Sequence, residues 1–344
     1  MLRAITACRT ATLGGHVDAC LRCDHQAISY NSCRNRHCPK CQAQARQRWL
    51  ARREQDLLSV PYFHVVFTLP HQLNPLCQRY PRLLYDLLFR ASAQTMLEVA
   101  ANPKHLGARI GFLSILHTWG QNLRLHPHLH CVVPAGGFAP GYSRWVHPKY
   151  AFFLPIKVLS RVFRGKYLAL LQQALCKRRI DYPSTLVRAL LKDDWVVYTK
   201  PAFGDPSRVL RYLGRYTHRV AISNQRLLSF DGQRVSFRWK DYAHGNKQRI
   251  MTLTAIEFLR RFCQHVLPRG FVRIRHFGYL ASARRTALLA LARQQLACQP
   301  PRSSPVTDSP SAVWRCPRCG ANMFIGPNLT AQQLALRCKL SDSS

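Results

Sequence analysis

Apolar positions along the chain follow two kinds of spacing, and each spacing predicts a different element. Short apolar runs bounded by proline or glycine predict buried strands, and PYFHVVFTL at residues 61–69 is the clearest of them. Further strands are predicted over residues 109–119 and 128–133, which together suit an antiparallel hairpin. Apolar residues three and four apart predict long helices over residues 76–101 and 156–179.

The second half of the chain continues this mixture. A strand is predicted over residues 195–203, and a helix over 205–217 begins with the oxygen cap of Asp205 followed by proline. After a β-rich section, Thr254 and Glu257 form a capping box that opens another helix. The pattern as a whole predicts an α+β fold, with an antiparallel sheet flanked by helices.

The chain is expected to consist of three parts. Residues 1–50 are rich in cysteine, histidine and arginine and poor in aliphatic periodicity, which indicates a small zinc-binding module that recognises DNA. Residues 60–290 contain the predicted sheet and helices and form the main domain. Residues 299–344 begin with a Pro/Ser-rich stretch and are predicted to be a linker and a short, flexible cysteine-containing tail.

The charge of the chain indicates its partner. Lysine and arginine number 51 against 15 acidic residues, a formal net charge of +36. Such an excess opposes compact folding unless a polyanion is bound, so a nucleic-acid partner is expected. The basic residues are spread along the chain, which disfavours a membrane-surface role, and no apolar run reaches the roughly 18 residues of a membrane span. The N-terminus lacks the apolar stretch of a signal peptide, so the 14 cysteines are expected to be thiols or zinc ligands in a bacterial cytosol.

Two Cys-x-x-Cys pairs near the N-terminus supply the thiolates of a structural tetrahedral zinc site, with Cys33 and His37 between them as alternates. The four predicted ligands are Cys20, Cys23, Cys38 and Cys41. Basic residues beside them suit contacts with DNA phosphates, namely Arg34, Arg36 and Lys40. The C-terminal CPRCG offers only Cys316 and Cys319, half of a zinc ribbon or a remnant of one, and no metal site is predicted there.

The triplet His128-Leu129-His130 lies on a predicted strand. Side chains alternate faces along a strand, so both imidazoles point one way and Leu129 points into a core. If the hairpin closes with a loop of about six residues, His117 falls opposite His130 and supplies a third ligand, with Gln121 as its competitor. Such a site would hold Mg²⁺ or Mn²⁺ with positions open for a phosphate. Packed structural histidines are the alternative interpretation.

Tyr212 and Tyr216 are four residues apart, which places two phenols on one face of the predicted helix over 205–217. A phenol that attacks phosphorus forms a 5′-phosphotyrosine bond, so DNA strands can be cut and rejoined without ATP. Aromatic core packing is the alternative. Basic residues interleave with the tyrosines and suit phosphate better than a core: Arg211, Arg215 and Arg219.

Five blocks of the sequence resemble a known family, the rolling-circle transposases of the insertion-sequence-91 type, which belong to the two-tyrosine HUH (His-hydrophobic-His) class. The blocks are YNSCRNRHCPKCQ at 30–42, FTLPHQLN at 67–74, HTWGQNLRLHPHLHCVVPAGG at 117–137, YLGRYTHRVAISN at 212–224 and GFVRIRHFGYLA at 270–281. The resemblance implies an N-terminal zinc-binding domain and an HUH-nuclease-like antiparallel sheet. It also implies that His128 and His130 are metal ligands and that Tyr212 and Tyr216 are nucleophiles. Compared with members of this family, the chain is expected to begin a few tens of residues late.

The resulting hypothesis is a DNA transposase that nicks and rejoins single-stranded transposon ends through 5′-phosphotyrosine and drives rolling-circle transposition. Its expected cofactors are catalytic Mg²⁺ or Mn²⁺ and structural Zn²⁺, with no membrane and no small-molecule substrate. It would act in the bacterial cytoplasm and associate with the nucleoid when bound to DNA. The alternatives are a plasmid replication initiator or relaxase with the same chemistry, and a non-enzymatic zinc DNA-binding protein.

Overall fold

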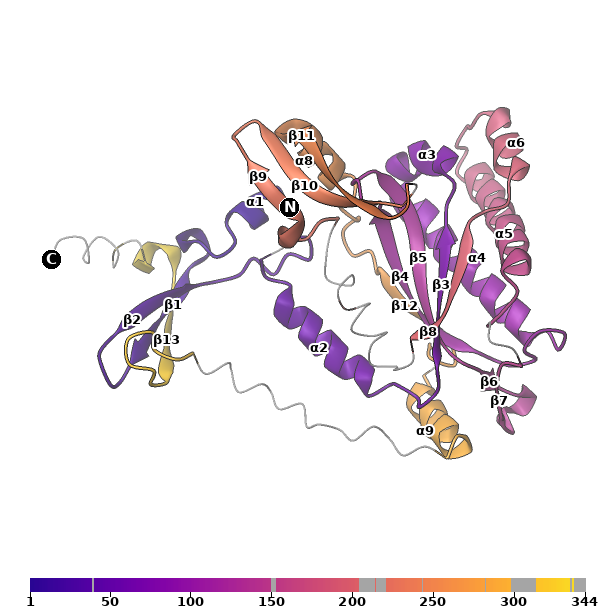
Figure 1. The fold of residues 1–344 in the computed structure, drawn as a ribbon, viewed down its shortest axis with the longest axis horizontal. Helices are drawn as coiled ribbons and strands as arrows, with labels where there is room; N and C mark the ends of the chain where they lie inside the picture. The colour runs from indigo at the N-terminus through magenta and orange to yellow at the C-terminus, as the bar shows by residue number, and fades with distance from the viewer. Residues whose placement is uncertain are drawn as a thin grey trace. The chain divides into compact units, whose positions relative to one another are not determined.

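The chain divides into two compact units in the computed structural model (Figure 1). The terminal unit combines residues 1–52 with the C-terminal residues from 302 onward, and the sheet unit contains most of residues 53–301. Within the described residues, no helix is long and apolar enough to cross a membrane. The structure describes residues 1–38, 40–149, 153–203, 214, 221–242, 244–281, 283–297, 314–334 and 336.

The terminal unit is built on a three-stranded antiparallel sheet whose strands come from the N-terminal and C-terminal parts of the chain. Its central strand β1 (Gly15–Cys20) pairs with β2 (Gln26–Tyr30) on one side and with β13 (Met323–Leu329) on the other. The prediction of a flexible tail is corrected for residues 323–329, because these residues form β13 and supply the backbone partners that β1 would otherwise lack. The helices of this region are α1 (Leu2–Thr6), η1 (Ala11–Leu13) and α2 (Ala43–Glu54).

The sheet unit contains a five-stranded antiparallel sheet in the order β12-β4-β5-β3-β8. The four predicted strands appear at their expected places, and β5 begins three residues earlier than its predicted start at 128. The earlier start matters because it shortens the turn after β4 and so changes the register of the hairpin. The strands are β3 (Tyr62–Thr68), β4 (Gly111–Trp119), β5 (Leu125–Pro134), β8 (Val197–Phe203) and β12 (Ile274–Gly278).

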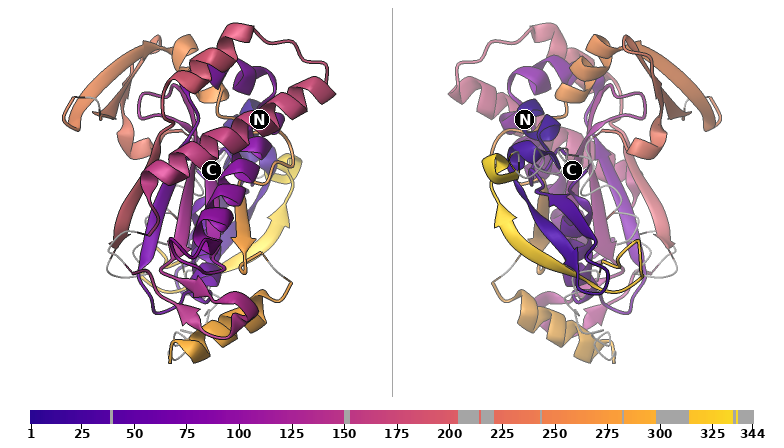
Figure 2. Two further views of the ribbon diagram at one scale, coloured as in Figure 1. Left: turned by 90° about the vertical axis from the view of Figure 1, so that its right-hand side faces the viewer. Right: turned by 90° about the vertical axis from the view of Figure 1, so that its left-hand side faces the viewer.

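Two long helices, α4 (Pro81–Ala101) and α5 (Ile156–Lys177), cover one face of this sheet (Figures 1 and 2). The core between them is aromatic. The ring of Phe67 on β3 lies 4.9 Å from that of Phe163 on α5, and Phe277 on β12 lies 6.3 Å from Phe89 on α4. Because side chains alternate along each strand, the residues between these core positions point to the opposite face of the sheet.

The helix predicted over 76–101 is divided in two, α3 (Asn74–Arg79) and α4. The break is at Tyr80, whose φ of −128° and ψ of 55° are not helical. The cause is Pro81, since the ring of a proline disfavours helical geometry at the residue before it. Pro81 itself is well placed at the start of α4, where its missing N–H would have no helical acceptor.

A second, smaller antiparallel sheet of the same unit has the order β11-β10-β9. Phe237 on β10 is fully buried and its ring lies 5.9 Å from that of Phe258 on α8. The predicted cap of α8 is confirmed, since Thr254 Oγ1 accepts a hydrogen bond from the Glu257 N–H at 3.3 Å. The elements are β9 (Leu227–Phe230), β10 (Arg234–Asp241), β11 (Lys247–Thr254) and α8 (Ala255–Cys263).

The shorter elements of the sheet unit complete it. They are η2 (His71–Leu73), β6 (Gly137–Phe138), η3 (Pro140–Tyr142), β7 (Trp145–Val146), α6 (Ser184–Lys192), η4 (Asn224–Arg226) and α9 (Arg285–Gln295). The helix predicted over 205–217 lies outside the described residues except for Gly214, and the linker predicted over 299–312 lies outside them entirely.

Candidate functional site

Three histidines from neighbouring strands meet on the sheet face opposite α4 and α5. His128 and His130 are two apart on β5 and share that face, while Leu129 between them is 0% exposed and pairs with the core residue Phe67. His117 on β4 lies directly opposite His128. His117 is buried, whereas His128 and His130 are partly exposed. The predicted alternation is therefore confirmed, since His128 and His130 lie on one face of the sheet and Leu129 lies on the other.

The predicted register of this hairpin is wrong by two residues. His117 was expected opposite His130, but Ile115 takes that position. The reason is that pairing continues to Leu125, across from Trp119, which leaves a shorter turn than the one assumed. A shift of two residues keeps every side chain on its own face of the sheet, so His117 still joins the other two histidines.

The ring nitrogens of this histidine triad converge on one point. His128 Nε2 and His130 Nε2 are 3.1 Å apart, and one nitrogen from each of the three rings lies within 4.8 Å of the others. Two ligands in adjacent positions of an octahedral ion, with bonds of about 2.1 Å, lie about 3 Å apart. The triad therefore fits a divalent ion, and no carboxylate of the described residues joins it within 4.8 Å.

Neighbouring groups orient two of the three rings. His128 Nδ1 donates to the backbone carbonyl of His126 at 2.7 Å, which leaves its Nε2 lone pair for a metal. His130 Nδ1 is 2.7 Å from Nε2 of His64 on β3, and the two rings stack with centroids 4.9 Å apart. If His130 binds metal through Nε2, its Nδ1–H donates to His64. His64 was missed in the sequence; its signal was a single histidine within an apolar strand.

Burial keeps these imidazoles neutral. Desolvation lowers the pKa of His128 to about 3 and that of His64 to about 4. Desolvation also holds the pKa of His130 well below 6.5, and the neighbouring histidines lower it further. Neutral imidazole is the form that binds a metal ion, so the site is ready for a cation at neutral pH without first losing protons.

The turn between β4 and β5, residues 120–124, is held by side chains of the smaller sheet and its flank. Arg226 donates to the carbonyl of Gln121, Arg261 to the carbonyl of Asn122 at 3.0 Å, and His265 Nε2 lies 3.1 Å from the carbonyl of Leu123. Gln121, the competing third ligand, is thus placed in this turn, whereas His117 is already within reach of the other two histidines. The geometry favours His117.

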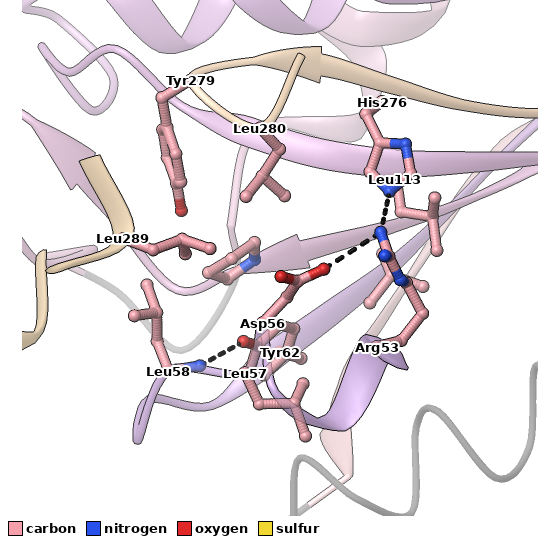
Figure 3. A pocket seen from close by; sticks show the side chains of 12 residues that line it. Arg53, Asp56, Leu57, Leu58, Tyr62, Leu113, His276, Tyr279, Leu280 and Leu289 are labelled. Carbon is pink, nitrogen blue, oxygen red and sulfur yellow. Dashed lines mark hydrogen bonds and ion pairs between the residues drawn. The ribbon is translucent and has the colours of Figure 1, made fainter. Parts of the chain in front are cut away.

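A pocket on the same sheet face is a second candidate (Figure 3). Leu113, which precedes His117 on β4, and its partner Val132, which follows His130 on β5, line the pocket. Its charged groups already have partners, since Arg53 Nη1 is 2.9 Å from His276 Nε2 and 3.0 Å from Asp56 Oδ2. An apolar hollow with paired charges suits packing better than phosphate chemistry, and the histidine triad is the stronger candidate.

The cysteines of the terminal unit form two four-thiol groups rather than the one predicted. The first consists of Cys8, Cys33, Cys38 and Cys41, and the second of Cys20, Cys23, Cys316 and Cys319. In each group all four sulfur atoms lie within 4.8 Å of one another. Four thiols at one point are the donor set of a structural zinc ion, so the structure supports zinc in this unit.

The predicted zinc ligands Cys20, Cys23, Cys38 and Cys41 are accordingly divided between the two groups. Cys33 is a member of the first group, as its alternate status allowed, and its Sγ lies 3.8 Å from that of Cys41. His37 is not, and its Nδ1 lies 3.2 Å from Asn35 Oδ1 instead. The sequence missed Cys8, which precedes the first Cys-x-x-Cys pair and has no spacing signal of its own.

Some of the predicted DNA-contacting residues are described and others are not. Beside the first cysteine group, Arg34 and Lys40 are exposed and Arg36 is partly buried. The two predicted nucleophiles and the arginines around them lie outside the described residues, namely Tyr212, Tyr216, Arg211, Arg215 and Arg219.

Comparison with known proteins identifies the class. Residues 111–287, which contain the histidine triad, match the family model Y2_Tnp, described as "Putative transposase". Residues 1–69, which contain the whole of the first cysteine group, match the model of a transposase zinc-binding domain, Zn_Tnp_IS91. By class, the chain is a transposase with an N-terminal zinc-binding domain.

Two curated relatives match nearly the whole chain. "Putative transposase y4qJ" of Sinorhizobium fredii is 47% identical over 349 residues, which cover 94% of this chain and 87% of the relative. The transposase for insertion sequence element IS801 of Pseudomonas savastanoi pv. phaseolicola is 30% identical over 365 residues, 96% of this chain and 86% of the relative. No solved structure matches the chain significantly. The chain belongs to the insertion-sequence-91 family of transposases, as the sequence blocks predicted.

Proposed function

We propose that this transposase nicks and rejoins single-stranded DNA at the ends of its element through a 5′-phosphotyrosine intermediate, so that the element moves by rolling-circle transposition. The observation that supports the proposal most is the histidine triad, whose nitrogens converge on one point of the sheet that carries the family match. The protein would do this on bacterial DNA, in association with the nucleoid.

His117, His128 and His130 would hold the catalytic Mg²⁺ or Mn²⁺. A donor set made of imidazoles alone suits Mn²⁺ better than Mg²⁺, which prefers oxygen ligands. Because these ligands are neutral, they leave the full positive charge of the ion to attract and polarise the scissile phosphate. His64 would keep the ring of His130 in place.

Tyr212 or Tyr216 would carry out the covalent step. The phenol oxygen forms a bond to phosphorus, the bond from phosphorus to the 3′ oxygen breaks, and that oxygen leaves as a 3′-hydroxyl with the proton lost by the phenol. Attack by a 3′-hydroxyl on the phosphotyrosine then restores a DNA bond and frees the tyrosine. In support, Arg226, ten residues after Tyr216, binds the Gln121 carbonyl in the turn beside the triad.

Exposed basic side chains would hold the DNA strand. On β10, Arg234, Arg238 and Lys240 alternate with the buried Phe237 and share the outer face of the small sheet. In the terminal unit, Arg34 and Lys40 are exposed. Contacts of this kind go to phosphates, so they would position single-stranded DNA largely irrespective of sequence.

Covalent capture of DNA tests the proposal. Full-length protein is incubated with Mn²⁺ and a labelled single-stranded oligonucleotide from an element end, and a denaturing gel detects the protein–DNA adduct. The wild type should form an adduct, and His130→Ala should form much less because the metal site loses a ligand. The double variant Tyr212→Phe and Tyr216→Phe should form none.

Tyr242→Phe is the matched control, because Tyr242 is an exposed tyrosine of the small sheet's β10–β11 turn and should not affect the adduct. No adduct with the wild type would contradict the proposal and favour a non-enzymatic DNA-binding protein. An undiminished adduct in the double tyrosine variant would exclude these residues as nucleophiles.

A further inference from the structure

The second cysteine group joins the two ends of the chain. Cys20 Sγ lies 3.5 Å from Cys319 Sγ, and Cys23 Sγ lies 3.5 Å from Cys316 Sγ. These separations are far longer than a disulfide bond of about 2.05 Å. They are close to the separation of about 3.8 Å between thiolates on a tetrahedral zinc ion with bonds of about 2.3 Å.

The two Cys-x-x-Cys loops have the same backbone turn. The N–H of Cys20 bonds the carbonyl of His25 at 2.9 Å, and the N–H of Cys316 bonds the carbonyl of Ala321 at 2.7 Å, five residues on in both cases. The residue after the second cysteine is left-handed in both, Asp24 with a φ of 54° and Gly320 with a φ of 70°. A repeated tight turn that holds two sulfurs together is the shape of a zinc-binding loop.

Simple core packing explains the group less well. Cys20 and Cys316 are each 2% exposed and share their surroundings with Met323, as buried thiols in a core would. Cys23 and Cys319, however, are only partly buried, and all four sulfurs still aim at one point. Burial alone gives no reason for partly exposed thiols from opposite ends of the chain to converge.

We propose that Cys20, Cys23, Cys316 and Cys319 bind a second structural zinc ion, which fastens the C-terminal segment to the N-terminal module. The matched family models end at residue 287, so neither includes Cys316 or Cys319. The strand pairing beside the site supports this assignment, since Cys20 lies opposite Met323 in the β1–β13 ladder. Each loop also carries one exposed arginine, Arg22 or Arg318, directly before its second cysteine.

The zinc content of the purified full-length protein tests the proposal. The wild type should contain two zinc ions per chain. The variant Cys316→Ser with Cys319→Ser should contain one, and so should Cys33→Ser with Cys41→Ser, because each pair belongs to a different group. Cys176→Ser with Cys263→Ser is the control, since both thiols are exposed and belong to neither group, and it should retain two.

A wild type with one zinc ion per chain would overturn the proposal, and so would a Cys316/Cys319 variant that retains two. Cobalt substitution provides a readout that does not depend on zinc retention during purification, because cobalt(II) in a tetrahedral thiolate site absorbs visible light. This absorption should fall by about half in each cluster variant if the two sites hold equal numbers of thiolates. An unchanged spectrum in the Cys316/Cys319 variant would again contradict the second site. Neither measurement depends on the tyrosine chemistry proposed above.

Discussion

Replacing His64 by phenylalanine is expected to weaken Mn²⁺ binding, although His64 is not one of the three proposed ligands. His64 is buried on β3, and its Nε2 accepts the Nδ1–H of His130 at 2.7 Å when His130 Nε2 is the ligand. Phenylalanine keeps a planar ring to stack on His130 but removes the acceptor. The substitution therefore removes this hydrogen bond and keeps the stacked ring.

The magnitude follows from that bond. Loss of such a partner to a metal-binding histidine reduces metal affinity by about 10- to 100-fold. This corresponds to about 1.4 to 2.8 kcal/mol. For comparison, leaving one partner of a buried hydrogen bond unsatisfied costs about 1 to 3 kcal/mol of folding stability, which is of similar size.

Calorimetric titration of metal-free protein with Mn²⁺ measures the effect. His64→Phe should bind Mn²⁺ at least ten times more weakly than the wild type, and His64→Gln should recover part of the loss because its amide oxygen is again an acceptor. His105→Phe, outside the sheet, is the control. Equal Mn²⁺ affinities for folded His64→Phe and wild type would refute the argument that His64 orients His130.

Three further predictions concern stability. The free energy of unfolding should fall as the pH is lowered from 6.5 toward 4. Burial holds the pKa of His64 and His265 at about 4 in the folded protein, so over this range these histidines take up protons in the unfolded chain but not in the folded one. A denaturation midpoint that does not change over this pH range would contradict the prediction. Tyr279→Phe should stabilise the protein by about 1 kcal/mol, as measured by urea denaturation. Tyr279 is 4% exposed, and its hydroxyl has no hydrogen-bond partner among the described residues. A loss of stability would show that the hydroxyl is hydrogen-bonded. Leu129→Ala should destabilise the protein by about 2 to 5 kcal/mol, because it leaves a cavity in the core. The control Leu191→Ala, at a position that is 51% exposed, should change the free energy of unfolding little. Equal effects of the two substitutions would contradict the strand alternation that buries Leu129.

The sequence predicted the histidine triad better than the two cysteine groups, and the difference is physical. The faces of His128, Leu129 and His130 follow from the two-residue period of a strand, which is a local property. The register with His117 depended on where the turn ends, and the pairing of Trp119 with Leu125 could not be read from apolar spacing. Because that error was an even number of residues, the face was still correct.

The members of the two cysteine groups could not be assigned from local spacing. Local spacing groups Cys20 and Cys23 with the next Cys-x-x-Cys pair along the chain. In the structure, Cys20 instead lies beside Cys319, 299 residues away, and Cys23 lies beside Cys316, 293 residues away. The pairing of β13 with β1 brings these C-terminal cysteines beside Cys20 and Cys23. A long-range strand pairing has no signature in the composition of either segment, so local composition predicts only a flexible tail there.

The position of β1 between β2 and β13 also sets an order for assembly during synthesis. β1 and β2 leave the ribosome long before β13, because the strands of the sheet unit lie between them in the sequence. At about 5 to 20 residues per second, roughly 15 to 60 seconds separate them. Throughout that interval one edge of β1 is open, and the sheet unit is synthesised in full before the terminal unit can close. A chain that ends after β12 but before β13 would therefore contain the histidine triad but not a complete terminal sheet.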